Sequence, residues 1–422
     1  MALWRIHRAV PILILSSLRL KAMNILTLSS YDPTHRSHGG EIRLSEIIRF
    51  FQSQGHHVIS GGLLSSDHYK ESRYFLKRPE NSLLTRYVEN LFLMEDYAVG
   101  MEAYHSEAIS QELLHRIDCD IDAIFVEQPW MFGLATRIRD RTAKYLPIIY
   151  GSANIEYRLK RSILMSYFPE DHVEHCAKLI AEMELEAILQ CDGFAAVTEA
   201  DLSWIRSQRP DSSKISVLAA NAGNTSSIQP DESNACRDIS EHKRYALYVA
   251  SGHPPNVKGF YEMLGGHCGS FNGDELLVLA GSVGEGVYHD PKYKEIQTLH
   301  KHIKLSGVVR SETLQHLIFC AHQILLPITQ GEGSNLKTAE ALLSGKPIVA
   351  TSVSFRGYEA FQHLPQVIIA DTPREFKSAI RNNMRKDYTP GATHIPEIYY
   401  PLTWSYSLNP LAHLLSILKK QS

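Results

Sequence analysis

One pattern recurs along this chain: a short apolar run is followed by a loop of small or polar residues and then by a segment with helical periodicity. The first copy consists of the run at 23–30 (MNILTLSS), the loop at 31–40 and the segment at 41–54. In that segment the apolar residues fall on one helical face: Ile42, Leu44, Ile47, Ile48 and Phe51. Continuous apolar runs of this length are typical of parallel strands that are buried on both faces. The pattern therefore predicts an α/β fold with doubly wound sheets.

The alternation extends over both halves of the chain. In the first half we expect strands at 23–30, 57–60, 123–127, 147–150, 193–198 and 215–218. In the second half we expect them at 245–250, 275–280, 303–305, 323–327, 347–351 and 366–370. Besides 41–54, the expected helices are 172–190, 259–264, 335–343 and 408–419. Ligands of such sheets bind beyond the carboxyl ends of the strands, so we expect a site in a cleft between two domains.

A polar stretch at 223–243 separates the two halves, because it is rich in Ser, Asn and Asp and has no apolar period. A chain of 422 residues commonly forms two domains. The expected organisation is an N-terminal extension, a first domain, a linker, a second domain and a C-terminal segment with a helix, at 1–22, 23–222, 223–244, 245–395 and 396–422.

Composition argues against several classes of protein. The net charge is −3, so no basic surface is available to neutralise a nucleic-acid backbone, and we expect no nucleic-acid partner. The six cysteines form no CxxC pair, which argues against a zinc ribbon or a dithiol redox site and is typical of reduced cytoplasmic thiols. The sequence has no apolar run of about 18 residues, so it predicts no transmembrane helix.

The first 22 residues allow three interpretations. A basic segment precedes an apolar run at 9–18, as in a short signal peptide, but Arg19 and Lys21 follow where small cleavage-site residues belong. A native start at Met23, where the first strand begins, is the interpretation that we favour. A basic, apolar helix on the membrane surface is the third. The expected location is the cytoplasm, and peripheral contact with the inner face of the membrane stays open.

Residues 325–351 (LLPITQGEGSNLKTAEALLSGKPIVAT) carry the densest chemistry. A strand leads into a loop with Gly331 and Gly333, and a helix follows. Glycines let a ligand approach the backbone, and a helix N-terminus offers unpaired N–H groups to a phosphate. Glu332 in the loop and Glu340 in the helix could accept hydrogen bonds from sugar or ribose hydroxyls. We therefore expect a ligand site here, and the alternative is a glutamate pair on a solvated helix face.

This segment resembles the E-x7-E motif of family-4-type (group 1) glycosyltransferases of the GT-B fold, together with the E-A-L-x-x-G-K-P-I-V-A-T that follows it. The resemblance covers nearly the whole chain from Met23. Its further pieces are Gly39-Gly40, QGHHV at 54–58, NIEY at 154–157, TEAD at 198–201, PPNVKG at 254–259 and the C-terminal helix.

The resemblance implies two Rossmann-like domains that face a cleft, with the C-terminal helix crossing back to the first domain. It implies retaining transfer of a sugar, of hexosyl type, from a nucleotide-diphosphate sugar to a glycan or lipid-linked glycan, as in surface polysaccharide or glycoconjugate synthesis. The first domain would take the acceptor and the second the nucleotide sugar. No cofactor and no metal ion would be needed.

Carried over by position, Glu332 would contact the hydroxyls of the donor sugar and Glu340 the ribose. Lys258 would neutralise the diphosphate. Backbone amides of the loop and the helix start would hold phosphate or sugar, at Gly333, Ser334, Asn335 and Leu336. Gly39 and Gly40 would let the first domain approach the diphosphate. A lysine and oriented N–H groups would stabilise the charge that develops on the leaving diphosphate.

The sequence departs from the family pattern at two places. An arginine that often precedes the phosphate lysine is replaced by Ser251-Gly252-His253, so we expect help from His253. The histidine that often precedes N-I-E is Ala153, and His35 or His38 could take its role, although both could equally be solvated loop residues. Further acceptor-side candidates are Glu127 and Asn154, while the neighbouring Trp130 is as well explained by packing.

Two other motifs resemble binding sites but are better explained in another way. Residues 281–286 (GSVGEG) follow a strand, but their glycine spacing is not that of a dinucleotide loop, and Pro291 interrupts the helix that should follow. We expect this loop to lie near the nucleotide base instead. Asp118, Asp120 and Asp122 resemble a metal-binding triplet, but they precede a strand and therefore lie at the wrong edge of the sheet.

Two alternatives to a transferase stay open. One is a catalytically weak relative that binds sugar nucleotide or glycan as a subunit of a larger system. The other is a sugar-nucleotide epimerase of the same two-domain shape, which would need no acceptor.

Overall fold

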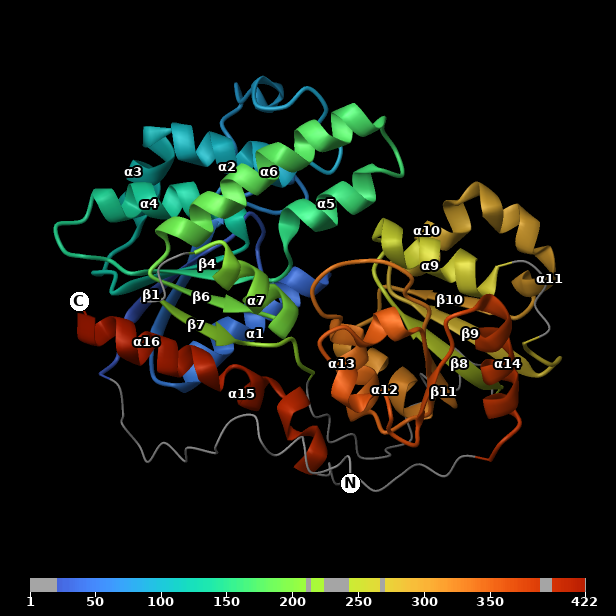
Figure 1. Cartoon of the computed structure of the whole chain (residues 1–422). Coiled ribbons are helices and arrows are strands. Elements are labelled where there is room, and N and C mark those ends of the chain that lie inside the picture. Colours follow the sequence, from blue (N-terminus) through green and yellow to red (C-terminus); the bar gives the residue numbers. More distant parts are fainter. Residues whose placement is uncertain (1–20, 210–213, 224–242, 266–269, 388–396, 422) are drawn as a thin grey trace.

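The computed structural model describes residues 21–209, 214–223, 243–265, 270–387 and 397–421. Two lobes lie side by side, and each is a parallel sheet between layers of helices (Figure 1). The first sheet has the order β3-β2-β1-β4-β5-β6-β7 and the second β10-β9-β8-β11-β12-β13. The predicted pair of doubly wound domains is therefore confirmed.

The first sheet consists of β1 (Asn24–Leu28), β2 (His57–Leu63), β3 (Phe75–Leu76), β4 (Ala123–Glu127), β5 (Ile148–Ser152), β6 (Gly193–Ala196) and β7 (Ile215–Leu218). Its helices are α1 (Gly39–Ser53), α2 (Glu95–His105), α3 (Glu107–Arg116), α4 (Phe132–Asp140), α5 (Glu156–Leu164), α6 (Glu170–Gln190) and α7 (Glu199–Ser207). Short 3-10 turns are η2 (Leu84–Arg86) and η3 (Pro129–Met131).

The second sheet consists of β8 (Arg244–Val249), β9 (Glu275–Ala280), β10 (Ile303–Gly307), β11 (Gln323–Leu326), β12 (Ile348–Ala350) and β13 (Val367–Ile369). Its helices are α9 (Pro254–Leu264), α10 (Val283–His289), α11 (Gln297–His300), α12 (Ser311–Cys320), α13 (Leu336–Leu343) and α14 (Pro373–Met384). The 3-10 turns are η4 (Pro291–Ile296), η5 (Ser352–Phe355), η6 (Glu359–Phe361) and η7 (Glu397–Leu402). The chain ends in α15 (Trp404–Ser407) and α16 (Asn409–Gln421).

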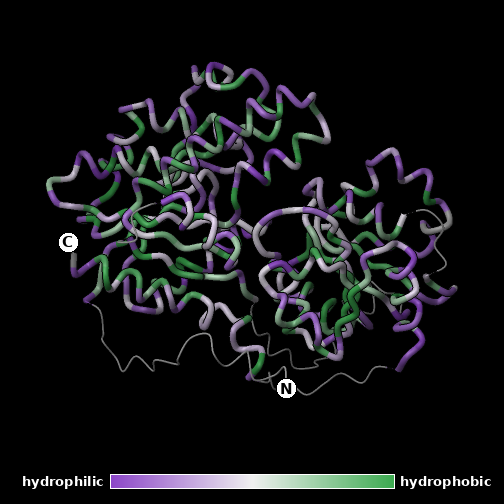
Figure 2. The backbone as a smooth tube through the Cα atoms, in the orientation of Figure 1, coloured by the Kyte–Doolittle hydropathy of each residue, from purple (hydrophilic) through white to green (hydrophobic). Residues whose placement is uncertain are grey.

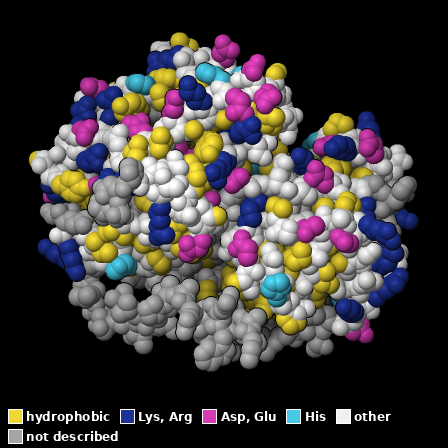
Figure 3. Space-filling model, in the orientation of Figure 1, with side chains coloured by type: hydrophobic (Ala, Val, Ile, Leu, Met, Phe, Trp, Pro, Cys, Tyr) yellow, Lys and Arg dark blue, Asp and Glu magenta, His cyan; other side chains and the backbone are white. Residues whose placement is uncertain are grey.

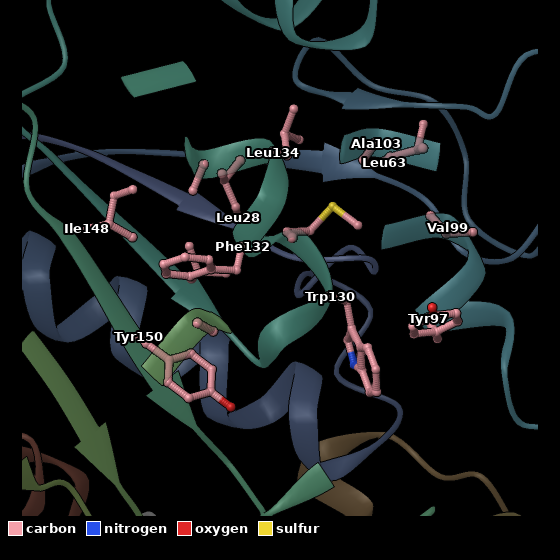
Figure 4. Close-up of a cluster of buried hydrophobic side chains, with 14 of the residues drawn as sticks. Leu28, Leu63, Tyr97, Val99, Ala103, Trp130, Phe132, Leu134, Ile148 and Tyr150 are labelled. Carbon is pink, nitrogen blue, oxygen red and sulfur yellow. The ribbon is translucent and has the colours of Figure 1, made fainter. Parts of the chain in front are cut away.

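Alternation along each strand sends apolar side chains to both faces of the first sheet. Leu26 and Leu28 of β1 enter one core with residues of α2, α4 and α6, whereas Ile25 enters the opposite core with α1 and α16. Figure 2 shows the strands as hydrophobic centres of both lobes. Figure 4 shows Trp130, Phe132 and Tyr150 packed in the first of these cores. Burial on both faces explains why the strands read as continuous apolar runs.

The C-terminal helix crosses back from the second lobe to the first. α16 packs Leu411, Leu414 and Leu415 into the core that contains Ile25 and Phe125. Gly193 of β6 lies directly against this helix, since a Cβ there would lie 2.6 Å from Leu414 Cδ1. The crossover that the GT-B resemblance implies is thus confirmed, and Figure 1 shows α16 under the first sheet.

Three helices, α1, α6 and α9, begin earlier than predicted, and the starts of α1 and α9 have a clear structural reason. α1 begins at Gly39 because of a capping box: the His38 side chain accepts from the Glu41 amide, and the Glu41 carboxylate accepts from the His38 amide. Gly39 and Gly40 therefore form the first helical turn rather than a loop. α9 begins at Pro254, so Lys258 lies on a helix, where the sequence predicted a loop that ended at 258.

Several elements were not predicted, among them the strand β3 and the helices α2, α3, α4, α5, α7, α12 and α14. The proposed extension at 1–22 and the linker at 223–244 fall almost entirely outside the described residues, so the domain boundaries stay predictions. Among the helices that are described, none is long and apolar enough to cross a membrane.

Candidate active site

The N-termini of three helices meet where the two lobes face each other. A Cβ on Gly39, the first residue of α1, would lie 3.4 Å from Leu336 Cδ1 at the start of α13. The third helix, α9, joins them because Lys337 of α13 donates to Asn256 Oδ1 in its first turn over 2.8 Å. Figure 1 shows α1 and α13 at the junction, and Figure 3 shows the surface notched between the lobes. Unpaired N–H groups at the starts of α1 and α13 and the dipoles of all three helices favour an anion at this point, whereas α9 begins with two prolines that have no N–H to offer.

The loop that connects β11 to α13 is shaped by glycine and by one arginine. Gly333 has φ +64°, and a Cβ there would lie 2.5 Å from the Ala153 carbonyl and from Asn154 Oδ1 of the first domain. Arg356 donates from Nε to the Gly333 carbonyl and from Nη2 to the Glu332 carbonyl, each over 3.2 Å. The loop is therefore fixed from both domains. We name residues 331–335 the donor loop.

Glu332 lies half-buried in the donor loop beside two cations. Burial raises the pKa of its carboxyl above the ordinary value, and the guanidinium groups of Arg356 and Arg158 offset part of this rise. Arg158 comes from α5 of the first domain, and its guanidinium lies 5.0 Å from the centre of the Trp204 ring. Both lobes therefore act on this carboxylate.

Glu340 lies one helical turn beyond Lys337 on α13, at the opposite end of the junction. Burial raises the pKa of Glu340 to about 7, although the positive charges of Lys337 and Arg36 oppose the rise. Burial likewise lowers the pKa of Lys337 to about 8. Gly223, where the chain leaves the first domain, lies against this pair, since a Cβ on Gly223 would lie 3.3 Å from Glu340 Cγ.

Two residues at the N-terminal end of α9, Lys258 and His253, were predicted to contact the diphosphate, and their surroundings differ. Lys258 is exposed, and its Nζ donates to Gln330 Oε1 over 2.9 Å and lies 3.9 Å from Glu262 Oε1. His253 precedes α9, and its pKa is lowered to about 4 by desolvation and by the positive charges of Lys160, Lys337 and His38. In the absence of a ligand His253 is therefore neutral, and its ring can donate a hydrogen bond.

Lys160 is a positively charged residue of the first domain that lies near His253. It comes from α5, donates to the Leu93 carbonyl over 2.7 Å, and lies 3.7 Å from the Asp96 carboxylate. Its ammonium group also lies 5.7 Å from the centre of the Trp130 ring. Sequence reasoning assigned no role to Lys160, Lys337 or Arg356, because their contacts depend on distant segments.

The two histidines proposed for the acceptor side occupy different positions. His38 caps α1, and its Nε2 lies 3.3 Å from Tyr69 Oη, which in turn donates to Glu41 over 2.7 Å. His35 is exposed and packs edge to face on His68 and Tyr69. His38 is thus held in the first-domain wall as a capping residue, whereas His35 keeps an open face.

Glu127 does not face the cleft as the sequence suggested. Its side chain is fully buried at the end of β4, and Arg43 Nε donates to its Oε1 over 2.8 Å. The acceptor role predicted for Glu127 is therefore wrong for a direct contact. Asn154 does lie at the junction, where its Nδ2 donates to Glu156 Oε1 over 3.1 Å and its Oδ1 borders Gly333. Trp130 is 2% exposed, which supports packing as its role.

Asn335 adds a donor that the sequence interpretation left to the backbone alone. It precedes α13 in the N-cap position, and its side chain does not cap the helix. Its Nδ2 is buried and finds no acceptor among the described residues. An amide in this position can donate to a ligand that enters the junction.

The glycine-rich segment at 281–286 and the acidic triplet at 118–122 both resemble binding motifs, and the structure shows their surroundings. Residues 283–289 of the glycine-rich segment form α10, so only Gly281, with φ +94°, keeps the character of a turn after β9; the predicted interruption at Pro291 comes after a complete short helix. Asp118 pairs with Arg73, and Asp122 pairs with Lys144 and accepts from the Asn24 amide at the start of β1. The acidic triplet therefore lies at the amino edge of the sheet, as predicted.

Comparison with solved structures defines the fold class. A UDP-forming α,α-trehalose-phosphate synthase from Burkholderia vietnamiensis aligns with a TM-score of 0.63 and 13% identity over 96% of this chain and 100% of that chain. Sucrose-phosphate synthase from Thermosynechococcus elongatus aligns with 0.62 and 14% over 95% and 100%. Anabaena HepE in complex with UDP and glucose aligns with 0.51 and 13% over 94% and 98%. The chain has the GT-B fold.

The family comparison concerns the second domain. Residues 233–386 match the model of the family described as glycosyl transferases group 1, which confirms the resemblance predicted from the E-x7-E motif. No curated protein sequence matches the chain.

Proposed function

We propose that this protein is a retaining glycosyltransferase that moves a hexosyl group from a nucleotide-diphosphate sugar to a glycan or lipid-linked glycan, in surface polysaccharide or glycoconjugate synthesis. The observation that carries the proposal is the junction of the N-termini of α1, α9 and α13 beside Lys337, with one carboxylate on each side. Such a junction suits a diphosphate between a sugar on the Glu332 side and a ribose on the Glu340 side.

In this arrangement the chain stabilises the leaving group. The bond from the anomeric carbon to the diphosphate breaks, and the acceptor oxygen forms the new bond while its proton passes to the departing phosphate. Lys337, Lys258 and the helix N-termini lower the energy of the negative charge that develops. Glu332 stabilises the positive charge at the sugar, and the Asn335 side chain donates to the donor. These groups supply the required charge, so the proposed reaction uses no metal ion.

A uridine nucleotide is the donor base that we propose first. The support is that two similar structures are described as a UDP-forming synthase and as a complex with UDP-glucose. The acceptor would lie against the first-domain wall near His35 and Asn154.

The test is incubation with a panel of nucleotide sugars, with and without a mixture of glycan and lipid-linked acceptors. We expect release of nucleoside diphosphate that rises with acceptor, and an α-configured product from an α-configured donor by nuclear magnetic resonance. Binding of the donors without release would favour the binding-subunit alternative. Conversion of one free nucleotide sugar into another would favour the epimerase.

A further inference from the structure

A row of buried polar groups joins the first sheet to the donor loop of the second domain. Arg43 of α1 donates from Nε to Glu127 Oε1 over 2.8 Å and from Nη1 to Asn221 Oδ1 over 3.2 Å. Asn221 then donates from Nδ2 to the Ser334 carbonyl over 2.9 Å. The row therefore runs from the carboxyl end of β4 to a backbone oxygen two residues after Glu332.

The groups in this row are removed from water. Arg43 and Glu127 are each 1% exposed, and Asn221 is 7% exposed. Burial raises the pKa of Glu127, and Arg43 opposes that rise. Hydrogen bonds between groups of this kind are strong in a low-dielectric interior, and a lost partner leaves a costly unpaired group.

Asn221 is held by the second domain at a second point. Tyr358, which is 2% exposed, donates from Oη to the Asn221 carbonyl over 2.9 Å. Asn221 thus accepts a hydrogen bond from Arg43 of the first domain through its side chain. It contacts the second domain twice, through its side chain to Ser334 and through its backbone carbonyl to Tyr358. The neighbouring Gly223 lies against Glu340, so the same short segment also borders the other carboxylate.

We propose that Arg43 and Asn221 are positioning residues that set the donor loop relative to the acceptor wall of the first domain. This inference rests on the proposed function, because it concerns the geometry of transfer between the two domains. Lys337, Lys258 and the N-terminus of α13 belong to the second domain, so most of the proposed contacts with the diphosphate do not depend on the row. Misplacement of the acceptor by about 1 Å can slow a reaction by about a hundredfold.

A purely structural role for the row makes a different prediction. Arg43 also donates to the Ala219 carbonyl over 2.9 Å, a contact inside the first domain. If the row only stabilises that domain, its loss lowers the melting temperature and leaves turnover of the folded protein unchanged. If it positions the donor loop, turnover falls while affinity for the free diphosphate is kept.

The decisive variant is Asn221→Asp. It keeps an oxygen for Arg43 but replaces the donor to Ser334 with an oxygen that faces the Ser334 carbonyl. Tyr358→Phe removes the second contact with little change of shape and serves where Asn221→Asp does not fold. The matched control is Asn383→Asp, a buried asparagine on α14 inside the second domain that is 5% exposed.

Three measurements on the full chain test the proposal: kcat for transfer, the Kd of UDP, and hydrogen exchange of the amides at 331–343. We expect Asn221→Asp to lower kcat by about tenfold or more, to change the Kd of UDP by less than about threefold, and to speed exchange at 331–343 by about tenfold. Tyr358→Phe should do the same to a smaller extent, and Asn383→Asp should do neither.

Unchanged kcat and unchanged exchange in a folded Asn221→Asp would overturn the proposal, as would a Kd of UDP that weakens in parallel with kcat. If the unaltered protein transfers no sugar, the proposed function fails, but the exchange measurement still decides whether Asn221 holds the donor loop.

Discussion

Lys337 and Glu340 lie one turn apart on α13, and each shifts the pKa of the other toward its ordinary value. Burial places the pKa of Lys337 at about 8 and that of Glu340 at about 7, so both groups are charged only in a narrow interval. The affinity of this site for a nucleoside diphosphate should therefore depend on pH.

We expect the affinity for UDP to fall as the pH rises above about 8, because Lys337 loses its proton there and a bound diphosphate favours the protonated lysine. The fall approaches about tenfold per pH unit, since binding takes up one proton. Calorimetric titration with UDP between about pH 6 and 9.5 measures it. Lys337→Met should bind UDP more weakly and lose this dependence; an unaltered slope in that variant would show that another group is responsible.

The two glutamates should affect different kinetic constants. Glu332→Gln should chiefly lower turnover, by about 2–4 kcal/mol of barrier, because it removes a charge aimed at the reacting sugar. Glu340→Gln should chiefly weaken donor and UDP binding, by about 1–3 kcal/mol, because it removes a uniform contact with the ribose. Steady-state kinetics and calorimetry on both variants check this. Normal binding and turnover in both would place these carboxylates outside the site.

Gly333 should tolerate no side chain. Gly333→Ala forces a methyl group to within about 2.5 Å of the Ala153 carbonyl and of Asn154, so the donor loop must move away from the first domain. We expect a loss of transfer of about tenfold or more. The control is Gly307→Ala, which has a similar φ of +63° but open space around it, and so carries only the backbone cost of about 1 kcal/mol. Equal effects of the two variants on transfer would contradict the contact.

Lys160 should contribute to diphosphate binding from the opposite domain. Lys160→Met should weaken UDP binding by about threefold to tenfold, since one positive charge near His253 is removed. Lys178→Met, on the exposed face of α6 beside Glu182, is the control and should have no effect. A Lys160→Met variant that binds UDP as tightly as the unaltered protein would confine the diphosphate site to the second domain.

Transfer should survive a chelator, because Lys337, Lys258 and the three helix N-termini provide the positive charge that a metal ion would otherwise supply. Transfer rates before and after treatment with EDTA measure this. Loss of activity in EDTA that manganese restores would require a metal ion in the reaction.

Periodicity and motif spacing predicted the fold, the loop between β11 and α13 and every described strand except the two-residue β3, because these depend on residues close together in the sequence. Glu332 and Glu340 were chosen as candidate site residues in this way. The start of α1 was missed because histidine is an uncommon N-cap residue, and its bond to the Glu41 amide is visible only in three dimensions. The start of α9 at Pro254 carried the usual signal of proline in the first turn, and this signal was overlooked.

The remaining site residues depend on contacts between distant parts of the chain. Glu127 ends a strand and was therefore assigned to the cleft, but Arg43, 84 residues earlier, covers it and pairs with it. Arg356 closes the donor loop from a turn after β12, and Asn221 reaches the same loop from the end of the first domain. No local pattern of sequence indicates which of many arginines and asparagines makes such a contact.

The return of α16 to the first sheet has a consequence for synthesis of the protein. The face that Leu411, Leu414 and Leu415 cover belongs to strands of the first sheet, all of which are made before the second domain, so this face stays open to water while the ribosome translates that whole domain. The second domain, by contrast, is continuous from β8 to α14 and can close its cores as soon as it emerges. A nascent chain should therefore carry a folded second lobe beside a first lobe that needs protection by a chaperone until its last helix is released.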